Sequence, residues 1–113
     1  MSDCLFCKII KGEIPSEKVY EDDYVYVFKD IEPTAPYHFL AVPKIHIETL
    51  DDVNEENSIY ISKIYEVISK ISKEYDFKDG FRVVTNCKEA AGQTVFHIHF
   101  HILAGRKFEW PAG

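Results

Sequence analysis

One stretch of the chain, Val95-Phe96-His97-Ile98-His99-Phe100-His101-Ile102-Leu103, alternates histidine with bulky apolar residues. A period of two is typical of a half-buried β-strand, because successive side chains point to opposite faces. One face of the strand would carry three imidazoles, those of His97, His99 and His101. The other face would pack into a core through Ile98, Phe100 and Ile102. The segment therefore requires a sheet with one apolar face and one face that bears histidines.

The remaining sequence predicts four further strands and two helices. The strands are expected over residues 19–21, 24–29, 38–43 and 81–86, and a short helix over residues 5–10. A long helix is indicated by an apolar stripe with helical spacing: Ile61, Ile64, Ile68, Ile71 and Tyr75. Asn54 is its expected N-cap, with Glu55 and Glu56 in the first turn. Turns and one long helix separate the strands, so the pattern favours an α+β fold with a mainly antiparallel sheet.

Size and charge exclude several classes of protein. The 113 residues suit one domain, spanning 1–113, and the formal net charge of −6 argues against nucleic acid as a partner. No apolar run is long enough to cross a bilayer, so no membrane association is expected. The first residues carry neither a basic segment nor an apolar signal core, which predicts a cytoplasmic location. Three cysteines in such a chain suit reduced thiols better than disulfides.

The three histidines admit three interpretations: half-buried packing, a metal site, or nucleophilic catalysis by an imidazole. The loop just before them, Ala91-Gly92-Gln93-Thr94, favours the third. Its glycine allows close approach of the backbone to a ligand, and its amide and hydroxyl groups can donate to phosphate oxygens. Together they predict an anion site beside a nucleophile, with His99 attacking and a neighbouring histidine assisting.

The segment 92–103 resembles the signature of the histidine triad (HIT) superfamily, in which three histidines alternate with apolar residues. The resemblance extends over nearly the whole chain, through segments 6–10, 13–15, 20–23, 30–31 and 35–44. The tail, with Gly105-Arg106 and Trp110-Pro111-Ala112-Gly113, is similar to the Hint branch and unlike the Fhit branch, which hydrolyses dinucleoside polyphosphates. The resemblance implies a single HIT domain with a five-stranded sheet, one long and one short helix, and a sheet that continues across a homodimer.

The resemblance also implies a purine-nucleotide site and a covalent nucleotidyl-histidine intermediate. His99 matches the nucleophile, His101 the histidine that contacts the phosphate, and His97 and His38 the supporting histidines. Asp30 matches the carboxylate that binds the ribose hydroxyls. Polar groups around the phosphate and leaving group correspond to Asn86, Gly92, Gln93 and Thr94. The apolar walls around the base correspond to Phe6, Ile9, Ile14, Phe28 and Ile31, and Trp110 matches the tryptophan that lies near the partner's active site.

Cys4-x-x-Cys7 forms a second constellation, which suggests metal binding or redox activity. No thioredoxin-like setting surrounds it, so metal binding is the preferred interpretation. A closed tetrahedral zinc site needs two more ligands, and His46 and His97 are the candidates. Some bacterial members of the family resemble this arrangement and carry zinc. The alternative is ordinary packing of two small residues in a short helix. A zinc ion here would be structural, and catalysis would need no cofactor.

These features predict a hydrolase that cleaves nucleoside phosphoramidates and related conjugates of purine nucleoside monophosphates. Three alternatives remain: a dinucleoside polyphosphate hydrolase, a nucleotide-binding regulator with incidental catalysis, and a metal-dependent hydrolase that uses the triad as ligands. The chain departs from the Hint pattern at Thr94, where serine is usual, at Ala104, where glycine is usual, and at Lys29, where histidine is common. The stiffer Thr94 hydroxyl could alter assistance to the leaving group.

Overall fold

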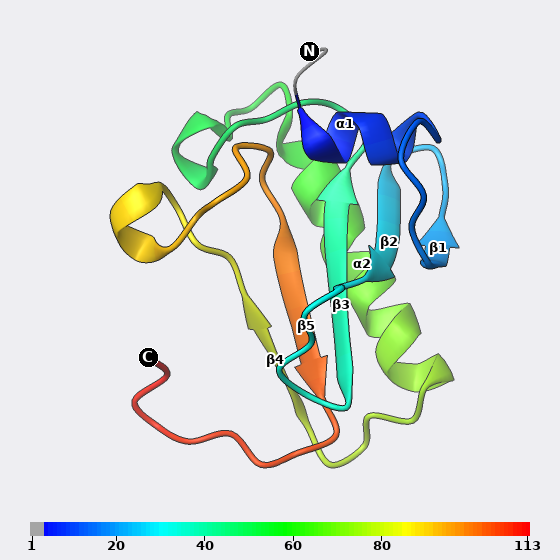
Figure 1. Ribbon diagram of the computed structural model, residues 1–113, viewed down its shortest axis with the longest axis vertical. Helices are drawn as coiled ribbons and strands as arrows, with labels where there is room; N and C mark the ends of the chain where they lie inside the picture. Colours follow the sequence, from blue (N-terminus) through cyan, green and yellow to red (C-terminus); the bar gives the residue numbers. More distant parts are fainter. Residues whose placement is uncertain (1–3) are drawn as a thin grey trace.

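Five strands form one antiparallel sheet in the structure, a computed structural model that describes residues 4–113 (Figure 1). The sheet order is β1-β2-β3-β5-β4. The strands are β1 (Lys18–Glu21), β2 (Val25–Lys29), β3 (Tyr37–Pro43), β4 (Phe81–Val84) and β5 (Phe100–Ala104). The helices are α1 (Leu5–Ile10) and α2 (Ser58–Glu74), with 3-10 turns at Leu50–Asp52 and Glu89–Ala91. This architecture confirms the expected α+β fold with one short and one long helix.

The two helices cover opposite faces of the sheet (Figure 1). The apolar stripe of α2 buries Ile64, Ile68 and Ile71 against the face that carries Ile98, Phe100 and Ile102. On the other face, α1 packs Phe6 and Ile9 over β2 and β3 through Phe28, Leu40 and Val42. The apolar residues between the histidines therefore build the main core, as the alternation predicts, and the histidines lie on the side of α1.

The histidine strand is shorter than its alternation suggests. β5 begins at Phe100, and its pairing with β3 ends at the pair Ala41–Phe100. The preceding backbone groups have other partners: the Ile98 N–H donates to the Ile47 carbonyl over 2.6 Å, and the Thr85 hydroxyl donates to the His99 carbonyl over 2.8 Å. These bonds replace the ladder, so residues 95–99 approach the sheet as an extended segment of irregular structure.

Two other boundaries differ from the expectation by two residues or more, whereas β1, β2 and β3 each begin within one residue of it. The long helix begins at Ser58 with Asn57 as N-cap, so the prediction of Asn54 as N-cap was wrong. The Asn54 side chain instead accepts bonds from the Glu56 and Asn57 N–H groups, over 2.9 and 3.0 Å, and so closes a separate turn before the helix. β4 ends at Val84, two residues earlier than expected, where the chain leaves β5 to form the loop that carries Asn86.

Within residues 4–113, no helix combines the length and the apolar character that crossing a membrane requires.

Candidate active site

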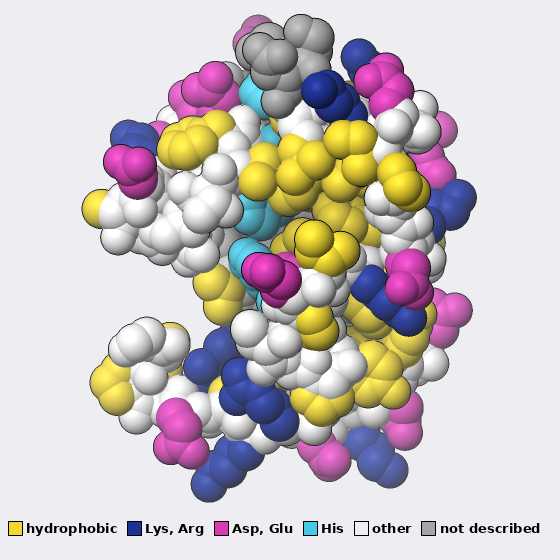
Figure 2. Space-filling model, in the orientation of Figure 1, with side chains coloured by type: hydrophobic (Ala, Val, Ile, Leu, Met, Phe, Trp, Pro, Cys, Tyr) yellow, Lys and Arg dark blue, Asp and Glu magenta, His cyan; other side chains and the backbone are white. Residues whose placement is uncertain are grey.

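A cavity of about 430 Å³ lies between α1, the start of β5 and the loop after β2. Its volume falls within the range of about 300–1,000 Å³ typical of small-molecule sites. The walls are mainly apolar, and their polar groups come from Asp30, Glu32, Thr94, His99 and His101. In Figure 2, histidine side chains follow a depression beside a patch of apolar side chains. An apolar cleft with a few converging polar groups is the usual form of a ligand site.

Most of the residues expected to bind nucleotide line this cavity. They are Phe6, Ile9, Ile14, Phe28, Asp30, Ile31, Thr94, His99 and His101. Ile31 is 95% exposed and lies at the rim. Asn86, Gly92, Gln93 and Trp110 do not line it, and neither do His38 and His97.

His99 has one ring nitrogen fixed by the backbone. Its Nδ1 lies 2.9 Å from the His97 carbonyl oxygen, which only accepts, so Nδ1 carries the proton. Burial lowers the pKa of His99, so the ring is neutral at pH 7 and its Nε2 keeps a free lone pair. The Phe6 ring packs edge-on against His99, with the ring centroids 5.0 Å apart. The side chain is therefore a neutral imidazole of fixed orientation in the wall of the cavity.

His101 is held in the opposite tautomer by a series of hydrogen bonds that begins at a backbone amide. The Thr34 N–H donates to His38 Nδ1 over 3.1 Å, so neutral His38 carries its proton on Nε2. That nitrogen lies 2.9 Å from His101 Nδ1, which must accept, and the proton of His101 is thereby placed on Nε2. Burial lowers the pKa of His101 to about 4, so the ring stays neutral. The cavity thus contains one imidazole with a free lone pair and one with an N–H donor.

Asp30 supplies the carboxylate of the cavity. Its Oδ1 accepts from the Glu32 N–H over 2.8 Å, and its Oδ2 lies 3.3 Å from His38 Nε2. These contacts hold the carboxylate at the end of β2, where it is only partly buried. Free lone pairs on both oxygens remain for vicinal hydroxyl groups.

The loop before the histidines is ordered by Gln93, whose side chain is 2% exposed. Its Nε2 donates to the carbonyls of Glu48 and Val95, and its Oε1 accepts from the Lys88 N–H over 2.7 Å. Both amide protons are used, so Gln93 has none for a phosphate and acts as the internal support of the loop. Gly92 has φ +98°, and a Cβ there would lie 3.7 Å from Asn86 Nδ2. The left-handed backbone therefore favours glycine here, whereas the Asn86 amide would leave an ordinary contact distance for a Cβ.

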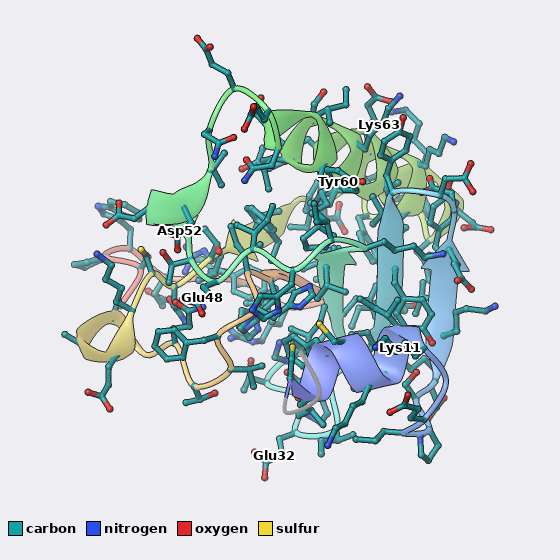
Figure 3. All side chains as sticks on the ribbon, turned by 90° about the horizontal axis from the view of Figure 1, so that it is seen from above. Lys11, Glu32, Glu48, Asp52, Tyr60 and Lys63 are labelled. Atoms are coloured by element: carbon teal, nitrogen blue, oxygen red, sulfur yellow. The ribbon has the colours of Figure 1, made fainter. Side chains whose placement is uncertain are left out.

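Next to the cavity, four side chains form a compact cluster: Cys4, Cys7, His46 and His97. Their ligating atoms all lie within 4.8 Å of one another. His97 Nδ1 lies 3.4 Å from Cys4 Sγ and 3.5 Å from Cys7 Sγ, and His46 Nδ1 lies 3.4 Å from Cys7 Sγ. Figure 3 shows sulfur atoms of the α1 segment next to a group of ring nitrogens, with Lys11 at the opposite end of the helix.

The geometry of this cluster fits a tetrahedral ion. Bonds of about 2.3 Å to sulfur and about 2.0–2.1 Å to nitrogen would set neighbouring sulfur and nitrogen ligands about 3.5 Å apart, close to the separations in the cluster. His97 Nε2 donates to the Pro43 carbonyl over 3.0 Å, so its Nδ1 presents a lone pair toward the sulfurs. Burial and the neighbouring Cys4 raise the pKa of Cys7 to about 11, so metal binding would displace a proton from this thiol.

His97 was expected both as a supporting catalytic residue and as a metal ligand. Its side chain is fully buried in the cluster and outside the cavity, whereas its carbonyl oxygen contacts His99. The two expected roles would therefore fall to different atoms of one residue. Cys87 is half-buried and lies outside the cluster.

The buried neutral imidazoles predict a loss of stability in mild acid. In the unfolded chain they take up protons near pH 6.5, whereas the pKa of His101 in the folded chain is about 4. Between these values the unfolded state binds more protons, so the free energy of unfolding should fall as the pH decreases from about 6.5 toward 4. Each unmatched proton contributes about 1.4 kcal/mol per pH unit. Denaturant titrations at several pH values measure this slope.

Carboxylates do not obscure the measurement between pH 6.5 and 5, because their contribution begins lower. Salt-bridge partners lower the pKa of Glu21 below 4.5, and hydrogen bonds from Tyr24 and Tyr20 lower that of Asp22 below 3.8. A free energy of unfolding that stays constant from pH 6.5 to 5 would contradict neutral burial of the histidines.

Five further residues line the cavity beyond those named from the sequence: Leu5, Pro15, Glu32, Leu40 and Val95. Leu40 had a usable signal, because it alternates with the core residues Phe39 and Ala41 on β3 and so faces α1. The hydrogen bond from the Thr34 N–H to His38 had no sequence signal, because a residue of any type except proline supplies a backbone amide.

The model of the HIT domain family matches residues 11–108. The chain is 43% identical over 105 residues to the purine nucleoside phosphoramidase of Escherichia coli strain K12, covering 92% of this chain and 88% of that protein. It is similar to the structure of a histidine triad protein from Clostridium difficile, with 53% identity, a TM-score of 0.93 and 96% of each chain covered. A HIT family hydrolase from Legionella pneumophila Philadelphia 1 gives 44% identity and a TM-score of 0.95, over 98% of this chain and 100% of that one.

Proposed function

Because the chain belongs to the HIT domain family and resembles hydrolases throughout its length, we propose that it cleaves nucleoside phosphoramidates and related purine nucleoside monophosphate conjugates. The reaction would pass through a covalent nucleotidyl-histidine on His99. The observation that carries the proposal is the pair of opposite tautomers in one cavity, a free lone pair at His99 Nε2 and an N–H at His101 Nε2. The name of the Escherichia coli relative supports this choice of substrate.

In the first step, His99 Nε2 attacks the α-phosphorus, the new P–N bond forms, and the bond to the departing amine breaks. The His101 N–H donates to the leaving nitrogen, and one proton from solution is consumed as the amine departs. The His99 ring then carries a positive charge, and its Nδ1–H donates to the His97 carbonyl. In the second step, water attacks phosphorus, the P–Nε2 bond breaks to release AMP and neutral His99, and one proton passes to solution, which balances the proton consumed in the first step.

The nucleoside would occupy the apolar part of the cavity. Phe6, Ile9 and Phe28 would enclose the base, and Asp30 would accept bonds from the ribose hydroxyls. Thr94, at the edge of the cavity, would donate to a phosphate oxygen through its hydroxyl. Gln93 enters the proposal as the residue that orders this loop, and Asn86 as an amide that lies close to Gly92.

The substrate class is tested with purified protein and two adenosine compounds. We expect hydrolysis of adenosine 5′-phosphoramidate to exceed that of diadenosine polyphosphates by roughly tenfold or more in kcat/KM, followed as AMP release by chromatography. A preference for the dinucleotides would instead support a polyphosphate hydrolase. Binding of AMP with negligible turnover of either compound would support a nucleotide-binding regulator.

Zinc is the metal that best suits two thiolates and two imidazoles in the Cys/His cluster. Cys4, Cys7, His46 and His97 would hold it, and it would stabilise the junction of α1 with the two segments that carry the histidines. Catalysis by His99 needs no ion in this scheme. A metal-dependent hydrolase would instead lose turnover completely at saturating substrate when a chelator is added.

We also propose a homodimer in which the C-terminal segment reaches the partner's site. β4 is an edge strand of the sheet, and Trp110 is 83% exposed and lies outside the cavity of its own chain. We expect twice the mass of one chain in sedimentation equilibrium. Because Trp110 is the only tryptophan, AMP should change the intrinsic fluorescence of the dimer. A monomer, or fluorescence that is unaffected by bound AMP, would contradict this arrangement.

A further inference from the structure

We propose that the Cys/His cluster and the nucleotide cavity are thermodynamically coupled, so that a divalent metal in the cluster raises the affinity of the cavity for a purine nucleoside monophosphate. The inference rests on the nucleotide site proposed above. It assigns His97 as a positioning residue that acts through His99, and it gives the metal a role beyond general stabilisation of the fold.

The first link is His97 itself. Its Nδ1 faces both sulfurs at 3.4 and 3.5 Å, and its Nε2 is bound to the Pro43 carbonyl. Its carbonyl oxygen accepts from His99 Nδ1 over 2.9 Å. An ion that fixes the His97 ring therefore also fixes the backbone atom that sets the tautomer and direction of the His99 ring.

The second link is α1. Cys4 caps this helix and Cys7 lies one turn later, so the two thiols flank Phe6. The Phe6 ring meets His99 at 5.0 Å and His97 at 6.0 Å between centroids, and Ile9 of the same helix lines the cavity. Helices of six residues are marginal alone, so their position depends on tertiary contacts. Anchoring both thiols would hold the wall against which the base packs.

Through both His97 and α1, a bound ion would restrict the motion of the cavity wall. Without an ion, the cluster is joined by weak thiol hydrogen bonds, whereas four metal–ligand bonds would restrict α1 and the segment before β5 together. The nucleotide would then bind a wall that is already ordered, and would lose less of its binding free energy in ordering it. Coupling free energies between two sites commonly correspond to factors of about 5–150 in affinity, and we expect roughly tenfold here.

The test uses the native protein, Zn²⁺ and AMP. Isothermal titration should give an AMP Kd that is about tenfold higher after chelation than in the zinc-loaded protein. Linkage requires the reciprocal result, so saturating AMP should tighten Zn²⁺ binding by the same factor, measured by competition with a chromophoric chelator. This second measurement involves neither turnover nor any variant.

Two variants separate the coupling from nonspecific effects. His46→Ala removes a ligand that does not line the cavity, and leaves Phe6, His97 and His99 in place. We expect it to bind AMP as weakly as the chelated protein and to show no response to Zn²⁺. The matched control, Cys87→Ser, changes a thiol outside the cluster and should keep the full response. If His46→Ala does not fold, the reciprocal measurement on the native chain decides.

An AMP Kd that is the same with and without Zn²⁺ would overturn the coupling and leave the proposed function intact. Failure of Zn²⁺ to bind the native protein would overturn it as well. If AMP binds neither form, the nucleotide site itself is wrong, and the proposed function fails together with the inference.

Discussion

Replacing His99 with asparagine should abolish hydrolysis of adenosine 5′-phosphoramidate, with a fall in kcat of roughly 10³-fold or more. The change removes Nε2, the only atom proposed to bond to phosphorus. The shorter amide retains an N–H near the position of Nδ1, so it can still donate to the His97 carbonyl that now accepts over 2.9 Å. The fold and the cavity should therefore survive a substitution that removes the nucleophile.

The control for His99→Asn is nucleotide binding by the same variant. Its AMP Kd, measured by isothermal titration, should stay within about threefold of the native value, because the apolar walls and Asp30 are unchanged. Loss of both turnover and AMP binding would indicate a collapsed cavity, and would require the same test with His99→Gln. Turnover that persists in a folded, AMP-binding variant would exclude His99 as the nucleophile.

Replacing His101 with alanine should reduce kcat for the phosphoramidate by about 10²- to 10⁴-fold, the usual contribution of a positioned proton donor. The Nε2–H assigned to His101 by the Thr34–His38 chain would be lost. His38 would keep a partner, because its Nε2 also lies 3.3 Å from Asp30 Oδ2, so no buried donor is left unpaired. Single-turnover kinetics would report the chemical step directly.

A second substrate with a different leaving group distinguishes two possible roles of His101, proton donation to the leaving group and binding of the phosphate. A p-nitrophenyl ester of AMP departs as a stable anion and needs no proton, so His101→Ala should slow its cleavage by only about tenfold or less. An equal loss for the amine and the nitrophenyl compounds would show that His101 acts on the phosphoryl group in both reactions, and would contradict its role as donor to the leaving nitrogen.

The fold was predictable because its strongest signals are periodic. The alternation from Val95 to Leu103 and the stripe on α2 both indicate which side chains face the core, and Ile98, Phe100 and Ile102 pack into it as expected. The start of β5 was not predictable in this way. Residues 95–99 have a strand-like pattern, but their backbone groups bond to Ile47 and Thr85, which lie far away in the sequence.

The site was predicted by residue type better than by role. Cys4, Cys7, His46 and His97 do meet, because the chain brings α1, the segment after β3 and the segment before β5 to the same end of the sheet. Only the structure reveals that the His97 ring faces the thiols of the cluster while its carbonyl faces His99. The same holds for the internal role of Gln93, since its sequence position does not reveal that both amide protons bond to backbone carbonyls.

Rapid quench of the native protein with adenosine 5′-phosphoramidate labelled at phosphorus, followed by mapping of the labelled residue, tests the central claim most directly. The account predicts an acid-labile, base-stable adenylyl group on His99 that forms and decays at rates compatible with turnover, and that is missing from His99→Asn. Label on another residue, or full turnover with no covalent adenylyl-protein at any time, would contradict it.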